Sequence, residues 1–211
     1  MTIKKTLLLD EKALSASLIM ALALIYFGLQ QNQGLNYLII TIAFLIFSVV
    51  ATKIGKEEKK AMGLYEHMRS FENVIANGLI PIICLILGLT KGFIGSIAGI
   101  TADKFASELG VFGDDPIYLG NLKRVKKGTN GAVSIFGLLM SFLGSLLIGI
   151  TWAILTNNLD PKSILLIGVT GLFGSIGDSL AGIFEEKGIG NKYTSNVIGA
   201  IFGAMFGEIL L

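Results

Sequence analysis

The chain has 211 residues, of which 53% are hydrophobic, and it carries a formal net charge of +2 at pH 7. Its mean hydropathy of +0.73 is too high for an ordinary soluble domain and is typical of a protein that crosses a membrane several times. The single cysteine, Cys84, lies inside an apolar run, which excludes a disulfide framework and a cysteine metal site.

Seven apolar segments, each near the ~20 residues that a helix needs to cross a bilayer, predict an all-α polytopic membrane protein. They cover about 13–29, 35–54, 74–90, 92–109, 132–156, 163–183 and 196–211. The first could instead be a signal peptide, because Lys4 and Lys5 precede it, but no clear cleavage site follows. Every polar stretch is too short to fold alone, so residues 1–211 are expected to form a single transmembrane domain.

The basic residues predict the orientation of these spans. Of 17 Lys and Arg residues, 14 fall in the N-terminus and in the segments 53–71, 110–131 and 184–195. These segments alternate with turns that hold only Lys91 and Lys162, and Lys104 lies in the end of a span. Because cytoplasmic loops are enriched in Lys and Arg, the N-terminus is predicted to be cytoplasmic and the C-terminus to lie outside.

Given that orientation, unusual polar residues gather at the cytoplasmic ends of the third to seventh spans. They are Arg69, Asn73 and Asn77 at helical spacing, Asp103 with Ser107 and Glu108, Asp178 with Ser175 and Ser179 between Gly174 and Gly182, and Thr194 with Asn196. An interhelical hydrogen bond would be enough to explain any single Asn or Ser in a span. Three carboxylates at one depth are costly near lipid, so Asp103, Glu108 and Asp178 predict a functional site.

A basic loop faces these carboxylates across the same membrane surface. It reads Lys123-Arg124-Val125-Lys126-Lys127-Gly128-Thr129-Asn130-Gly131 and leads into a span. The four cations alone would suit a topology anchor. Glycine-flanked backbone that opens a helix, however, also favours an anion, and Lys and Arg would hold phosphates. Carboxylates opposite phosphate require a divalent cation between them, so the sequence predicts a Mg²⁺–phosphate site with Asp103, Glu108 and Asp178 as metal ligands.

Several segments resemble the membrane family that contains plant phytyl-phosphate kinase and the animal transmembrane protein 19. The similar segments are Arg69–Gly78, Ala102–Gly110, Lys126–Ser134, Gly174–Gly182 and Tyr193–Ala200, in order and at suitable spacing over roughly residues 20–211. The chain departs from the family pattern Asp-Thr-Trp-Ala-Ser-Glu at Lys104 and Phe105. Lys104 therefore either adds a phosphate contact or marks a different substrate.

The acidic stretch followed by a basic Lys…Gly-Thr stretch is also similar to CTP-dependent polyprenol kinases and phosphatidate cytidylyltransferases. The resemblance implies phosphoryl transfer from CTP, or another nucleotide, to an isoprenyl monophosphate such as phytyl or geranylgeranyl phosphate. Asp103, Glu108 and Asp178 would be the catalytic carboxylates, with Mg²⁺ as cofactor. The expected substrate-binding residues are Arg69, Asn73, Asn77, Ser107, Lys126, Lys127, Gly128, Thr129, Asn130, Gly131, Ser179 and Asn196.

Other functions stay open at this point. A transporter of an organic anion or lipid is disfavoured, because the polar groups lie at one membrane face and no inverted repeat is visible. A lipid-phosphate cytidylyltransferase would use the same groups. A haem or redox role lacks ligands, since the sole histidine, His67, lies in a loop. The expected partners are the prenyl phosphate, whose tail would lie among the third to seventh spans, a nucleotide and cell-membrane lipids, with a homodimer possible and no nucleic acid.

Overall fold

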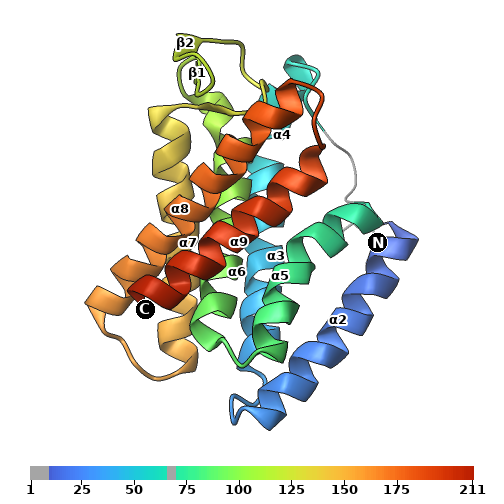
Figure 1. The fold of residues 1–211 in the computed structure, drawn as a ribbon, viewed down its shortest axis with the longest axis vertical. Coiled ribbons are helices and arrows are strands. Elements are labelled where there is room, and N and C mark those ends of the chain that lie inside the picture. The colour runs from blue at the N-terminus through green and yellow to red at the C-terminus, as the bar shows by residue number, and fades with distance from the viewer. Residues whose placement is uncertain (1–9, 66–69) are drawn as a thin grey trace.

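Seven long helices and one short helix dominate the computed structural model, which describes residues 10–65 and 70–211 (Figure 1). They are α2 (Glu11–Gln30), α3 (Asn36–Ile54), the short α4 (Lys56–Ala61), α5 (Phe71–Ile86), α6 (Thr90–Leu109), α7 (Ile135–Leu155), α8 (Pro161–Glu186) and α9 (Lys192–Leu210). Each predicted span falls on one long helix, so the all-α polytopic architecture is confirmed. Among the sequence predictions, those on Lys4, Lys5, His67 and Arg69 lie outside the described residues.

Five helices, α2, α3, α7, α8 and α9, are long and apolar enough to cross a membrane. Helix α5 is apolar but has only 16 residues. Helix α6 has 20 residues and carries Lys91, Asp103, Lys104 and Glu108. It packs against α3, α5, α7, α8 and α9, so protein rather than lipid surrounds most of its side chains. This enclosure is what allows charged residues in a membrane helix.

Side-chain caps explain where most of these helices begin. Asp10, Ser70, Ser134, Asp160 and Asn191 each accept a hydrogen bond from a backbone N–H of the first turn that follows. Helix α8 also has Pro161 at its first position, where a missing N–H costs nothing. Hydrogen bonds from the Ser163 side chain and backbone hold the pKa of Asp160 below its usual value.

A small sheet lies between α6 and α7, where the sequence predicted a plain loop. After the 3-10 turn η1 (Gly110–Phe112) come β1 (Ile117–Tyr118), β2 (Lys123–Arg124) and β3 (Ala132–Val133), in the order β2-β1-β3 with antiparallel pairing. The span expected from residue 132 therefore starts as a helix only at Ile135. Its first two residues pair with β1, and Ser134 then caps α7.

Glycines bring the three central helices into backbone contact. A Cβ on Gly95 of α6 would collide with the carbonyl oxygen of Gly203 on α9. A Cβ on Gly174 of α8 would lie 2.5 Å from the Cα of Gly99 on α6. Such close approach is the usual role of small residues between membrane helices. Consequently, residues one turn beyond these contacts on α6 and α8 are placed opposite one another.

Candidate functional site

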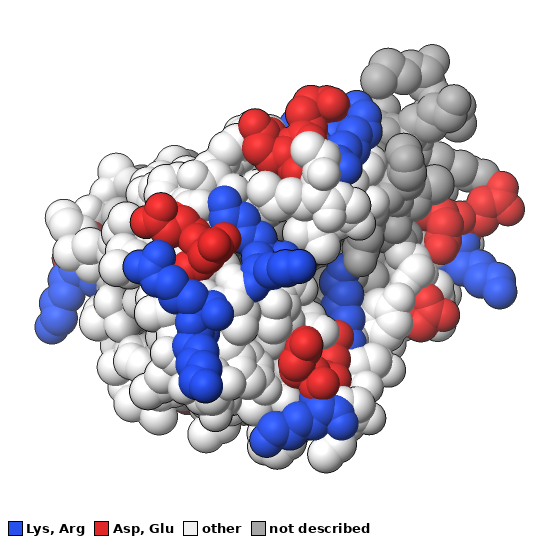
Figure 2. Space-filling model, turned by 90° about the horizontal axis from the view of Figure 1, so that it is seen from above, with Lys and Arg blue, Asp and Glu red and all other residues white. Residues whose placement is uncertain are grey.

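A polar cleft opens at the end of the molecule where α6 and α8 end and α7 and α9 begin. Figure 2 looks onto this end and shows Lys, Arg, Asp and Glu side chains in several groups over its surface. The cleft has a volume of about 450 Å³. Eleven of the sequence-predicted site residues line it: Asp103, Ser107, Glu108, Lys127, Gly128, Thr129, Asn130, Gly131, Asp178, Ser179 and Asn196.

Asp103 of α6 and Asp178 of α8 form the acidic floor of the cleft. Each lies one helical turn beyond the close contact between Gly99 and Gly174, so the same packing that joins the helices joins the carboxyl groups. Their carboxyl groups lie close enough to share a hydrogen bond. Two ionised carboxylates at this separation repel, so a proton or a cation must lie between them. The pair is therefore suited to hold a positive charge.

Glu108 does not join this pair, although the sequence predicted three converging carboxylates. Its Oε2 accepts from Lys59 Nζ at 2.9 Å, and its Oε1 lies 3.6 Å from Lys104 Nζ. Among the described residues, no group of three His, Cys, Asp or Glu side chains is placed to hold a metal ion. The expected convergence of three carboxylates is thus corrected to a pair of aspartates, because Glu108 pairs with Lys59 and Lys104 instead.

Lys59 reaches Glu108 because α4 folds back against the end of α6. A Cβ on Gly55, between α3 and α4, would collide with the carbonyl oxygen of Glu108, so only glycine permits this approach. The side chains of Lys59 and Glu108 are 12% and 7% exposed. From the sequence, Lys59 is only one of the cations that indicate the membrane orientation. Its nearness to Glu108 cannot be predicted, because it depends on tertiary packing.

The Gly128–Gly131 turn crosses the mouth of the cleft. Gly128 and Gly131 have φ of +89° and +71°, which glycine adopts at little cost. A Cβ on Gly182 of α8 would lie 2.5 Å from the backbone nitrogen of Gly131. Gly182 is one turn beyond Asp178, so this contact holds the turn beside the aspartate pair. Asn130 N donates to Glu186 Oε2 at 3.2 Å, which ties the turn to the same helix.

The turn was predicted to open a helix directly, and this prediction is wrong. Strand β3 and Ser134 separate it from α7, and Ser134 Oγ accepts from Gly137 N at 3.0 Å. The two predicted phosphate-binding lysines also differ. Lys127 lines the cleft and donates to Val111 O at 2.9 Å, whereas Lys126 is exposed and lies outside it.

The start of α9 and the end of α8 add lining residues that the sequence did not single out. Lys192 and Ser195 of α9 and Glu185 of α8 line the cleft, and Ser195 Oγ donates to Glu185 Oε2 at 3.1 Å. With its amide turned so that nitrogen faces acceptors, Asn196 donates to Asp178 Oδ1 at 3.3 Å. Thr194, by contrast, is exposed and forms a capping box with Asn191.

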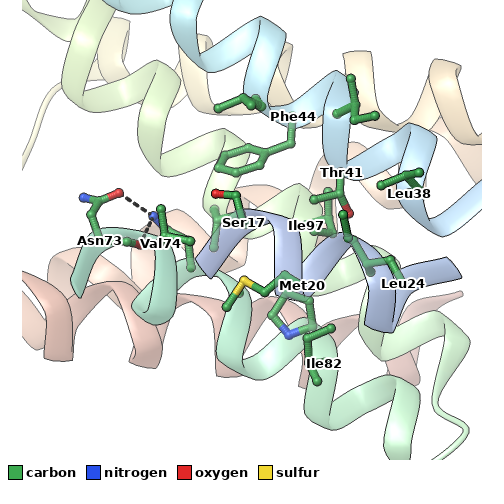
Figure 3. A pocket seen from close by; sticks show the side chains of 17 residues that line it. Ser17, Met20, Leu24, Leu38, Thr41, Phe44, Asn73, Val74, Ile82 and Ile97 are labelled. Carbon is green, nitrogen blue, oxygen red and sulfur yellow. Dashed lines mark hydrogen bonds between the residues drawn. The ribbon is translucent and has the colours of Figure 1, made fainter. Parts of the chain in front are cut away.

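Asn73 and Asn77 lie in a different cavity from the acidic pair. Both are buried, and the Asn77 amide donates to Asn73 O at 3.0 Å and to Asn73 Oδ1 at 2.9 Å. Apart from Ser17 and Thr41, the other residues that line this cavity are apolar, and it lies among α2, α3, α5 and α6 (Figure 3). The single site predicted from sequence is therefore divided into a charged cleft and a neighbouring apolar cavity.

Comparison with known proteins places the chain in a family of membrane proteins. Residues 2–203 match the family described as integral membrane protein DUF92. An uncharacterised membrane protein of Methanocaldococcus jannaschii is 40% identical over 99% of this chain and 88% of its own length. No solved structure matches.

Two proteins of Arabidopsis thaliana are more distant relatives. Protein PGR is 29% identical over 72% of this chain and 65% of its own length. Protein VTE6, a chloroplastic protein, is 24% identical over 93% of this chain and 64% of its own length. These relatives confirm the family that the motifs resemble. The chain belongs to the integral membrane protein family DUF92.

Proposed function

We propose that the protein is a kinase that transfers a phosphoryl group from CTP to an isoprenyl monophosphate at the cytoplasmic face of the cell membrane. The observation that carries this proposal is the Asp103–Asp178 pair, enclosed in one cleft with Lys59, Lys104 and Lys127. Paired carboxylates next to several cations are the parts that phosphoryl transfer uses. The likeness to VTE6 supports a related membrane enzyme family at low identity.

The charge balance in the cleft supports a role for a divalent cation. Four lysines line it, namely Lys59, Lys104, Lys127 and Lys192, together with the four carboxylates Asp103, Glu108, Asp178 and Glu185. With all eight side chains ionised these charges cancel, so the side chains alone would then offer no net positive charge to a triphosphate. Mg²⁺ is typically bound by one or two carboxylates plus substrate phosphates. The Asp103–Asp178 pair fits that donor set, and the bound cation would neutralise charge on the transferred group.

The chain's own residues then have positioning roles. Lys127 and the Gly128–Gly131 backbone would hold the nucleotide phosphates at the mouth of the cleft. From α9, Lys192 lines the cleft and Asn196 donates to Asp178. Lys104 stands where the family has threonine, and it would share its charge between Glu108 and an incoming phosphate. Glu108 would keep Lys59 and Lys104 oriented toward the cleft.

The proposed step needs no nucleophilic side chain. An oxygen of the acceptor phosphate forms a bond to the γ-phosphorus of CTP, the bond from that phosphorus to the β–γ bridging oxygen breaks, and CDP leaves with the electron pair. The second ionisation of a phosphate monoester has a pKa near 6. The acceptor oxygen is therefore largely unprotonated at neutral pH, and no general base is required.

Labelled CTP tests this proposal against its alternatives. Purified protein in lipid would receive Mg²⁺, geranylgeranyl phosphate and CTP labelled at either the α- or the γ-phosphate. Label from the γ-position should enter the lipid as geranylgeranyl diphosphate, and label from the α-position should not. Entry of α-label would make the protein a cytidylyltransferase. If neither label enters lipid while a labelled anion crosses proteoliposomes, the protein is a transporter. The other three nucleoside triphosphates, labelled alike, establish donor preference.

A further inference from the structure

We propose that the apolar cavity among α2, α3, α5 and α6 holds the prenyl chain of the acceptor while its phosphate lies in the charged cleft; this inference rests on the proposed function. The cavity has a volume of about 160 Å³, smaller than the ~300–1,000 Å³ typical of small-molecule sites, and it also opens outward. It is not among the third to seventh spans, where the sequence placed the tail, but among the first four.

The wall of this cavity offers a ligand almost no polar group. Figure 3 shows Leu24 and Leu38 at one end and Asn73 at the other. The Ser17 hydroxyl donates to Ala13 O and the Thr41 hydroxyl to Tyr37 O, each at 2.8 Å. Both hydroxyls therefore satisfy themselves on their own helix. What remains for an occupant is apolar surface, which suits a hydrocarbon chain.

The polar end of the cavity points to where a head group would leave it. Asn73 and Asn77 are the buried amides at this end, and their mutual hydrogen bonds hold them in place. Asn73 lies one turn beyond Ser70, whose hydroxyl is 3.2 Å from the hydroxyl of Tyr193 on α9. Tyr193 is next to Lys192, which lines the charged cleft. The amide end of the cavity is thus beside the cleft.

Helix α6 joins the two spaces directly. Ile97 and Ile100 line the apolar cavity, and Asp103 and Lys104 line the cleft. Ile100 and Asp103 are three residues apart, which is about 4.5 Å along a helix axis. A lipid phosphate with its head at Asp103 would therefore have its first carbons at Ile100. One continuous ligand explains why an apolar cavity and a charged cleft share this helix.

Photocrosslinking tests the location of the chain without requiring turnover. The probe is geranylgeranyl phosphate with a diazirine at the end of its chain, added to the protein in lipid nanodiscs without nucleotide. Crosslinks that unlabelled geranylgeranyl phosphate competes away should map to cavity residues such as Met20, Phe44 and Ile82. Competed crosslinks confined to α7, α8 and α9, or none that are competed, would overturn the assignment.

A matched pair of substitutions on α2 tests the cavity by chain length. Ala21 lines the cavity, whereas its neighbour Leu22 is 69% exposed on the outer face. Ala21→Phe should raise the Kd of geranylgeranyl phosphate at least about tenfold, roughly 1.4 kcal/mol. The Kd of dimethylallyl phosphate, whose short chain stays near the cleft, should change less than about twofold. Leu22→Phe should change neither value. Equal effects on both ligands would contradict the proposal.

The two tests separate this inference from the kinase proposal. If γ-label enters the lipid but the crosslinks map elsewhere, the kinase stands and the cavity assignment fails. If crosslinks map to the cavity without any label transfer, the cavity binds the prenyl chain and the kinase fails. Should Ala21→Phe not fold, the crosslinking of the unmodified protein decides the question alone.

Discussion

Lys59 Nζ and Glu108 Oε2 lie 2.9 Å apart and join α4 to the end of α6. This contact changes the role expected for Glu108. In the proposed mechanism, a carboxylate held between Lys59 and Lys104 would orient these cations, and the Asp103–Asp178 pair would hold the positive charge. The first predictions separate these two roles.

Glu108→Gln should lower stability more than activity. It removes one charge from an ion pair whose side chains are 12% and 7% exposed, and breaking such a pair typically costs about 3–5 kcal/mol. Unfolding in mixed micelles measures the loss. Glu57→Gln is the matched control, because its pair with Lys60 is largely exposed and should matter far less. A stable Glu108→Gln variant without activity would instead indicate a direct catalytic role.

Asp103→Asn should have the opposite profile. It removes one of two mutually repelling carboxylates, so the protein should stay folded with an unchanged or higher thermal midpoint. Its kcat should fall at least about 100-fold, roughly 2.7 kcal/mol of transition-state stabilisation. Turnover rates and thermal unfolding of the same preparation check both parts. Normal turnover with Asn at both Asp103 and Asp178 would remove the cation site.

Lys127→Ala and Lys126→Ala should differ although the residues are adjacent. Lys127 lines the cleft and donates to Val111 O, while Lys126 is exposed outside it. Lys127→Ala should raise the nucleotide KM or lower kcat at least about tenfold, roughly 1.4 kcal/mol. Lys126→Ala should stay within about twofold. Equal small effects at both positions would mean that this loop only anchors the topology.

Gly182→Ala should displace the Gly128–Gly131 turn. The new Cβ would lie 2.5 Å from the backbone nitrogen of Gly131, and backbone cannot rotate away as a side chain can. Overpacking of this kind typically costs about 1–3 kcal/mol. Steady-state kinetics should show at least a tenfold rise in nucleotide KM, about 1.4 kcal/mol. An unchanged KM would show that the turn does not contact the nucleotide.

Single cysteines should report opposite sides of the membrane. In a Cys84→Ala background, Thr129→Cys in the turn should react with an impermeant maleimide only from the cytoplasm. Asn158→Cys, exposed in the connection between α7 and α8 at the other end of the bundle, should react only from outside. Labelling of Thr129→Cys from outside would reverse the proposed orientation and place the cleft on the wrong face for CTP.

The hydrophobic pattern predicted the helices well because each span repeats its apolar character over about 20 residues. Eleven of the fifteen predicted site residues line the cleft, and they were found because carboxylates such as Asp103 and Asp178 are costly near lipid. The pattern could not show that Lys59 reaches Glu108, which depends on the Gly55 contact, or that Lys192 faces the cleft. Nor could spacing show that Asn73 and Asn77 face an apolar cavity. Helical periodicity shows that two residues share a helix face, but not what packs against that face.

The central claim is that the aspartate pair supports phosphoryl transfer to a lipid phosphate. The most direct test compares the unmodified protein with Asp103→Asn, using γ-labelled CTP, Mg²⁺ and geranylgeranyl phosphate, and follows label into the extracted lipid. The account predicts geranylgeranyl diphosphate from the unmodified protein and at least about 100-fold less from the folded variant, a difference of roughly 2.7 kcal/mol. Equal label in lipid from both proteins, or label from neither, would contradict it.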